Sequence, residues 1–293
     1  MDRIRGYYEL LKLPYDGAVK FLINKYGIVS DDYYREESYS RFLEGHIQNI
    51  TKGKYSRTDD GLYTHHIDEY RYSNLSNSYF IKTYEYPYEV HKKERLVYCD
   101  LIEHAILHVL INKEKPIEDS VVRSSPGYKA FLQPTIVEWY IDEVKPQPNW
   151  MINCYNKAYL SPLEACKLCN HMDVTAGFNQ PFPESPEKYF EQERLLEVKK
   201  EKMKQDMIKS RKEFRESDKR EFEELKKIAR NLHAKSPRRS IIDVLYKFKS
   251  REGFIDYKEL RKDLNIYYKE ELIELVNEYA EKEYKIQHFM KSW

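Results

Sequence analysis

The residues of this sequence best suited to chemistry are four histidines in two short segments. His65 and His66 are adjacent, whereas His104 and His108 are four residues apart in an apolar stretch. Residues four apart on a helix lie on one face, so His104 and His108 can hold a single metal ion. Neighbouring residues of a strand point to opposite faces, so His65 and His66 cannot share one role.

A metal ion held by three histidines could support hydrolysis. One histidine of the adjacent pair, with His104 and His108, gives three nitrogen ligands and leaves coordination positions open for water and a phosphate oxygen. The other histidine of the pair would remain free of metal. Beside a metal-bound phosphate, such a histidine can act as general base on the attacking water.

The local sequence predicts a strand for the adjacent pair and a helix for the spaced pair. Asp59-Asp60-Gly61 is typical of a turn, and the following residues favour a strand that ends near the pair. From Leu96 to Val109 a broad apolar stripe without proline or glycine predicts a helix packed on one side. His91 lies in a charged segment between them, and we interpret it as a solvated surface residue.

This arrangement resembles the HNH endonucleases, also called His-Me finger or ββα-metal nucleases. Their hairpin carries a His-His-Ile-type pair, here His65 to Ile67, and their following helix carries His-x-x-x-His, here His104 to His108. The colicin-type DNases look closest in motif, and the resemblance covers about residues 55 to 112. It implies that His65, His104 and His108 are metal ligands and that His66 is the general base.

Two positions depart from the usual pattern of that family. Arg95 stands where an asparagine usually fixes the intervening loop, and Glu69 stands where a proline is common. Asn74 or Asn77 could supply the missing amide. The resemblance implies a divalent metal cofactor, with Mg²⁺, Mn²⁺, Zn²⁺ and Ni²⁺ as candidates, and it places Arg95 in the catalytic site.

Basic residues stand on both flanks of the histidines and could hold a phosphate backbone. They are Lys52, Lys54, Arg57, Lys92 and Lys93. Runs of charged residues usually lie on solvent-exposed surface without binding a ligand. The formal net charge of +1 argues against a protein surface that is basic throughout. We expect a nucleic acid as the partner, with DNA favoured.

A second metal site could lie further along the chain, in a proline-rich region. Its candidate ligands are Cys154, Cys166, Cys169 and His171. A Cys-x-x-Cys pair with a further cysteine and a histidine nearby could hold a structural Zn²⁺. The spacing fits no specific zinc knuckle, so ordinary buried thiols are the alternative. Four unevenly spaced cysteines are too few for a disulfide framework.

The composition is that of a soluble protein with a highly charged surface. Charged residues make up 34% of the 293 residues, and the mean hydropathy is -0.81. That length allows about two domains. The chain begins without the apolar core of a signal peptide, and no apolar run approaches a membrane span. We therefore expect a cytoplasmic location and no membrane partner.

We expect a mostly α-helical α+β fold with a small ββα-metal core and helical extensions on both sides. The expected regions are an N-terminal helical subdomain, the nuclease core, a proline-rich irregular region, a long charged helix and a C-terminal helical module. Their bounds are 1–52, 53–115, 116–186, 187–235 and 236–293. Polar residues interrupt the apolar seam of the long helix, so we expect a spacer that dimerises weakly at most.

The C-terminal module should contain three helices, over Ile241–Phe248, Tyr257–Leu264 and Lys269–Tyr284. Its segment Gly253–Glu259 is similar to the end of a calcium-binding EF-hand loop, but Phe248 occupies the first ligand position and excludes that site. The alternative to an endonuclease is a non-catalytic nucleic-acid or protein binding module, in which the histidines hold a structural metal or none.

Overall fold

The computed structural model describes residues 3–114 and 127–282. The chain divides into two compact units, Met1–Arg194 and Leu195–Trp293. The fold is mostly helical, and the described strands form a single two-stranded antiparallel sheet, as the sequence predicts. None of the described helices is both long enough and apolar enough to cross a membrane.

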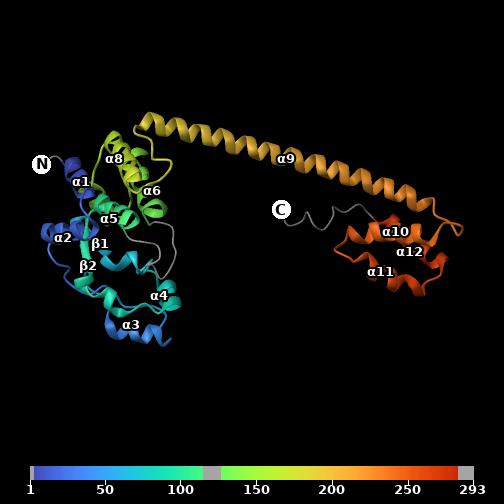
Figure 1. The fold of residues 1–293 in the computed structure, drawn as a ribbon, viewed down its shortest axis with the longest axis horizontal. Helices are drawn as coiled ribbons and strands as arrows, with labels where there is room; N and C mark the ends of the chain where they lie inside the picture. Colours follow the sequence, from blue (N-terminus) through green and yellow to red (C-terminus); the bar gives the residue numbers. More distant parts are fainter. Residues whose placement is uncertain (1–2, 115–126, 283–293) are drawn as a thin grey trace. The chain divides into compact units, whose positions relative to one another are not determined.

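Helices of the first unit surround the two short strands (Figure 1). The strands are β1 (Tyr63–His66) and β2 (Leu96–Cys99). The helices are α1 (Arg3–Leu11), α2 (Tyr15–Tyr26), α3 (Glu36–Leu43), α4 (Ser78–Tyr84), α5 (Leu101–Glu114), α6 (Gln133–Ile136), α7 (Asn149–Lys157) and α8 (Pro162–Thr175). Shorter helical turns are η1 (Thr58–Asp60), η2 (Ile67–Tyr70), η3 (Tyr88–His91), η4 (Lys93–Arg95), η6 (Tyr128–Leu132) and η7 (Val137–Ile141).

The histidine pair ends strand β1, as predicted. The turn before it ends at Gly61, whose φ of 75° lies in the left-handed region that glycine adopts without strain. The prediction for Leu96 and Val97 is wrong, because both belong to β2 and not to the helix. Helix α5 starts only after Asp100. There the Glu103 amide donates to the Asp100 carboxylate at 2.9 Å, and the Asp100 amide donates to Glu103 at 2.8 Å.

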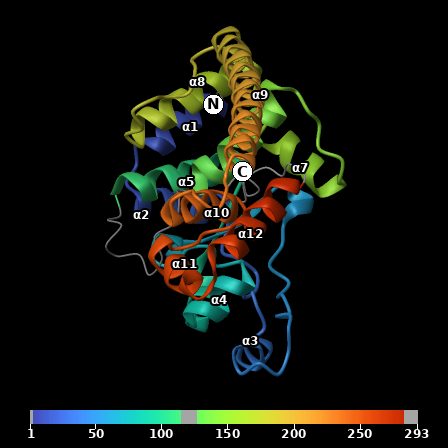
Figure 2. The same ribbon diagram turned by 90° about the vertical axis from the view of Figure 1, so that its right-hand side faces the viewer.

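The register of the sheet sends the two adjacent histidines to opposite sides. His65 pairs with Val97, and His66 pairs with Leu96. Val97 belongs to the core built on α1, α2, α5 and α8, whereas Leu96 belongs to a second, tyrosine-rich core. In both views α5 lies between α1 and α8 on one side and α3 and α4 on the other (Figure 2).

Helix α5 is the central element of the first core. It packs against α1, α2 and α8, and it is buried on nearly all sides and not only on one as expected. Helices from the predicted regions 1–52, 53–115 and 116–186 thus share one core, so the boundary at residue 52 does not separate domains. The boundary between residues 115 and 116 lies outside the described residues.

The second unit has a core of its own. Helix α9 (Pro186–Arg230) contributes Phe222, Leu225 and Ala229 to it. The other helices are α10 (Arg238–Ser250), α11 (Tyr257–Asp263), the turn η8 (Leu264–Ile266) and α12 (Lys269–Glu281). Three helices are therefore present where the sequence predicts them, although Tyr284 lies outside the described residues. The boundary predicted at residue 235 is wrong, because the last turns of α9 belong to this core.

Candidate metal centre

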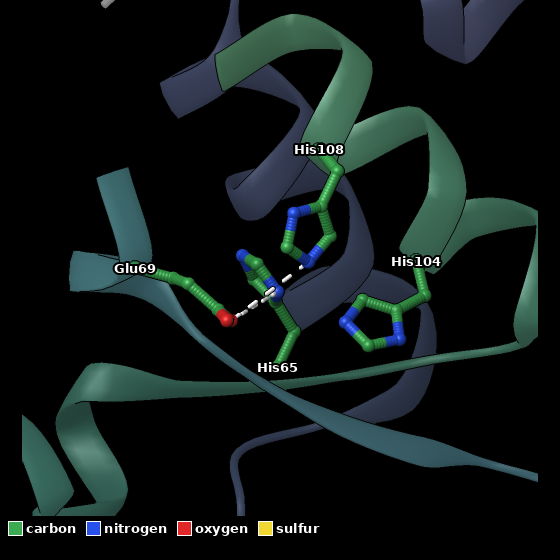
Figure 3. A group of neighbouring side chains, drawn as sticks. All are labelled: His65, Glu69, His104 and His108. Atoms are coloured by element: carbon green, nitrogen blue, oxygen red, sulfur yellow. Dashed lines mark ion pairs between the residues drawn. The ribbon is translucent and has the colours of Figure 1, made fainter. Parts of the chain in front are cut away.

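Four side chains from three elements converge in the first unit (Figure 3). They are His65 from β1, Glu69 from η2, and His104 and His108 from successive turns of α5. Each offers one ligand atom, and the four atoms lie within 4.8 Å of one another. This group could hold a metal ion, and no other group of this kind occurs in the part of the chain that the structure describes.

The spacing of the group suits an ion better than direct hydrogen bonds. Nδ1 of His65 lies 3.6 Å from Oε2 of Glu69, and Nε2 of His108 lies 3.8 Å from the same oxygen. Both separations exceed a hydrogen bond. Ligand atoms about 2.0–2.1 Å from a tetrahedral Zn²⁺ are about 3.3 Å apart. Small side-chain movements would therefore bring these atoms to coordination distance.

Burial gives the histidines the protonation state of metal ligands. It holds the pKa of His65 and of His104 well below the ordinary range, and the neighbouring histidines lower both further. Burial also lowers the pKa of His108 to about 4. All three rings are neutral near pH 7, so each keeps a lone pair for an ion. Nδ1 of His65 and Nδ1 of His104 are buried without a hydrogen-bond partner among the described residues, a costly state that coordination would relieve.

Glu69 is the candidate ligand that the sequence prediction missed. Burial raises the pKa of its carboxyl to about 7, and a bound cation would favour the ionised form. The sequence alone shows it only as a departure from the family pattern. The sequence feature that could have indicated it is its position four residues after His65, because the turn η2 brings its carboxylate back toward the His65 ring.

Gly127 lies directly against the His108 ring. A Cβ atom on Gly127 would lie 2.9 Å from Cε1 and 2.9 Å from Nδ1 of His108. That separation is closer than real Cβ contacts, so any other residue here would require the ring or the backbone at Gly127 to shift. The sequence prediction missed this residue too, since its role depends on a contact between segments distant in the chain.

His66 lies on the other side of the sheet and is not part of the metal-binding group. Its Nε2 lies 3.2 Å from Nδ1 of His91, and its ring centroid lies 4.5 Å from that of Tyr33. The interpretation of His91 as a solvated residue is wrong, because the side chain is fully buried and lies against the rings of Tyr34 and Tyr39. Burial lowers the pKa of His91 to about 3.

Arg95 is engaged by an ion pair next to the metal-binding group. Its Nε donates to Oδ2 of Asp68 at 2.6 Å, and its Nη2 donates to Oδ1 of the same carboxylate. Asp68 precedes Glu69, so the pair ties η2 to the start of β2. Of the two candidate amides, Asn77 caps α4 by accepting from the amide of Tyr79. Asn74 adopts a left-handed backbone conformation.

Asp31 and Asp32 bind the main chain of two of the predicted basic residues. The main-chain amide of Lys54 donates to Asp31 at 2.6 Å, and that of Lys93 donates to Asp32 at 2.8 Å. The side chains of both lysines remain exposed. The backbone thus brings the two basic segments together.

The remaining basic side chains contact aromatic rings or main-chain groups. Lys52 lies over the ring of Tyr33 at 5.9 Å, and Lys92 lies over that of Tyr88 at 5.8 Å. Arg57 donates to Asp60 at 2.7 Å and to the carbonyl of Tyr26 at 2.9 Å. The contacts of the Arg57 side chain therefore stabilise the fold.

The alternative of ordinary buried thiols describes the cysteines of the proline-rich region. Cys154, Cys166 and Cys169 are buried thiols, and no metal-binding group among the described residues contains them. Burial raises the pKa of Cys166 to about 11, which keeps the thiol protonated and a poor ligand. His171 packs its ring on Tyr8 instead, with 5.2 Å between centroids.

In comparisons with known proteins, no family model, no curated protein and no solved structure matches the chain. The resemblance to HNH endonucleases therefore depends on the motif itself and remains a prediction. The observed order of strand, strand and helix agrees with that motif, with His65 on β1 and His104 and His108 on α5.

Proposed function

We propose that this protein is a metal-dependent endonuclease that hydrolyses phosphodiester bonds of nucleic acid, with DNA as the favoured substrate. The observation that supports the proposal best is the convergence of His65, His104 and His108 from a strand and a helix in ββα order. The exposed lysines at positions 54 and 93 would hold the phosphate backbone.

A metal ion bound by the three histidines would polarise a phosphate oxygen and lower the pKa of a bound water. In the proposed reaction the chain supplies neutral imidazole ligands and a packed core that keeps their rings in place. Arg95 would stabilise phosphate charge with the part of its guanidinium that Asp68 leaves exposed.

His66 is the proposed general base, and its surroundings define how it would act. Its Nε2 is hydrogen-bonded to Nδ1 of His91, so proton transfer would use the other ring nitrogen, Nδ1 of His66. His91 would then orient the ring of His66, as a third group orients the base in other hydrolytic sites.

A structural metal site is the second candidate, and Glu69 is the observation that favours it. Three histidines and a carboxylate fill all four positions of a tetrahedral Zn²⁺, and closed four-ligand sites are usually structural. In a catalytic site, Glu69 would have to leave one position to water, or the ion would have to accept more than four ligands.

Plasmid cleavage separates the two candidates. Purified protein is incubated with supercoiled DNA and Mg²⁺, Mn²⁺, Ni²⁺ or Zn²⁺, with and without chelator. Nicking that requires the metal and disappears in His104→Ala supports the endonuclease. A rise in melting temperature with Zn²⁺, with no cleavage under any ion, supports the structural site and refutes the endonuclease.

A further inference from the structure

Tyr15 lies where the elements that carry the metal-binding group meet. It is the first residue of α2, and its side chain is fully buried. Its hydroxyl lies 3.1 Å from Nε2 of His65 and donates to the carbonyl of Ile67 at 2.7 Å. Its main-chain amide donates to Glu114, the last residue of α5, at 2.8 Å. One residue therefore contacts the strand, the turn and the helix that supply the four ligands.

The hydrogen bonds of this hydroxyl determine the tautomer of His65. A tyrosine hydroxyl has one proton to donate, and here it goes to the carbonyl of Ile67. Toward His65 the hydroxyl can only accept, so Nε2 of the imidazole carries the N–H. In a neutral imidazole the other nitrogen then holds the lone pair. That nitrogen is Nδ1, which is buried and lies 3.6 Å from Oε2 of Glu69.

We propose that Tyr15 is a positioning residue of the metal centre, whose hydroxyl holds His65 in the Nε2–H tautomer and so makes Nδ1 the ligand atom. The same hydroxyl holds the carbonyl of Ile67, two residues before Glu69, and thereby fixes the start of η2. The inference rests on the metal centre of the proposed function and does not depend on phosphodiester chemistry.

The bonding pattern distinguishes this role from that of a tyrosine that only fills the core. Tyr39 is also buried, and its hydroxyl donates to the carbonyl of Tyr86 at 2.7 Å, but it contacts no member of the metal-binding group. Tyr39→Phe is therefore a matched control for Tyr15→Phe. Each change deletes one buried hydroxyl that bonds a main-chain carbonyl and keeps the ring.

The test combines zinc titration with nitrogen NMR. Zn²⁺ is titrated calorimetrically into the full chain, into Tyr15→Phe and into Tyr39→Phe. Loss of a hydrogen-bonding partner of a metal ligand typically lowers metal affinity about 10- to 100-fold, which we expect for Tyr15→Phe only. In the zinc-free full chain, ¹⁵N spectra of the imidazoles should show His65 protonated at Nε2 only. In Tyr15→Phe a share of the Nδ1–H tautomer should appear, a change that a purely structural role would not produce.

Two results would overturn the inference. One is a zinc-free spectrum in which His65 carries its proton on Nδ1, a result that needs no variant to fold. The other is equal zinc affinity for Tyr15→Phe, Tyr39→Phe and the full chain. If the full chain binds no zinc, the metal centre fails together with this inference. If zinc binds and Tyr15→Phe is weakened but DNA stays intact, only the endonuclease proposal fails.

Discussion

Replacement of Gly127 by alanine should damage the metal centre without unfolding the protein. The new Cβ atom would lie 2.9 Å from two atoms of the His108 ring, whereas ordinary contact begins at 3.4 Å. The ring must therefore move by about 0.5 Å, which exceeds the tolerance of about 0.2 Å in metal–ligand distances. A displaced ligand should weaken zinc binding about 10- to 100-fold, equivalent to about 1.4–2.8 kcal/mol.

The stability of the metal-free protein should change much less than its zinc affinity. Gly127 has a φ of -53°, so alanine fits its backbone conformation, and the smaller entropy of the unfolded chain contributes about 0.4–1 kcal/mol in favour of the variant. The matched control is Gly6→Ala in α1, where no atom lies within 4 Å of the added Cβ. Calorimetric zinc titration and urea unfolding of both variants provide the test. If Gly127→Ala bound zinc as tightly as the wild type, the contact of Gly127 with the His108 ring would not matter to the metal centre.

Three further predictions concern the histidines and Glu69. His104→Ala should lose zinc affinity and cleavage activity together. His66→Ala should keep its zinc affinity, but its cleavage rate should fall by about 10²–10⁴-fold, the scale of general-base catalysis. Calorimetric zinc titration and plasmid cleavage of both variants would show any reversal of this pattern. Glu69→Gln should make zinc affinity less dependent on pH near 7, because burial raises the pKa of Glu69 to about 7 and the wild-type carboxyl must lose its proton on binding. Burial lowers the pKa of His91 from 6.5 to about 3, so the unfolded chain binds one more proton than the folded chain between these pH values. His91 should therefore make the free energy of unfolding fall by about 1.4 kcal/mol for each pH unit as the pH drops from 6.5 toward 3. Urea unfolding of His91→Gln at several pH values tests this, and a pH dependence equal to that of the wild type would contradict it.

The convergence of His65, His104 and His108 could be predicted because local sequence encodes it. A spacing of four on a helix holds His104 and His108 on one face whatever surrounds them. The alternation of a strand separates His65 from His66 in the same way, and the sheet register agrees with it. These relations need only the correct secondary structure.

The features that the sequence failed to reveal depend on packing between distant segments. Glu69 joins the group because η2 turns it back, and Gly127 matters because it meets the ring of His108. His91 stands among charged neighbours in the sequence, yet tyrosine rings from other segments enclose it. For the cysteines, proximity in the sequence was no guide to a metal site, since Cys154, Cys166 and Cys169 belong to no metal-binding group among the described residues.

The predicted boundaries at residues 52 and 235 do not separate cores, because changes of composition along a chain do not mark where cores end. The proline-rich segment looked irregular, but its helix α8 packs directly on α5. The long charged helix looked like a separate spacer, but its last turns complete the core of the second unit through Phe222 and Leu225. Burial of apolar surface between distant segments decided both boundaries.

The most direct test of the central claim is a zinc titration of the purified full chain, followed by X-ray absorption at the zinc edge. We expect one ion per chain with three imidazole nitrogens and one further oxygen as ligands, and one fewer imidazole ligand in His108→Ala. Absence of stoichiometric binding, or a spectrum with sulfur ligands from the cysteines, would contradict the assignment of His65, Glu69, His104 and His108 as the metal site.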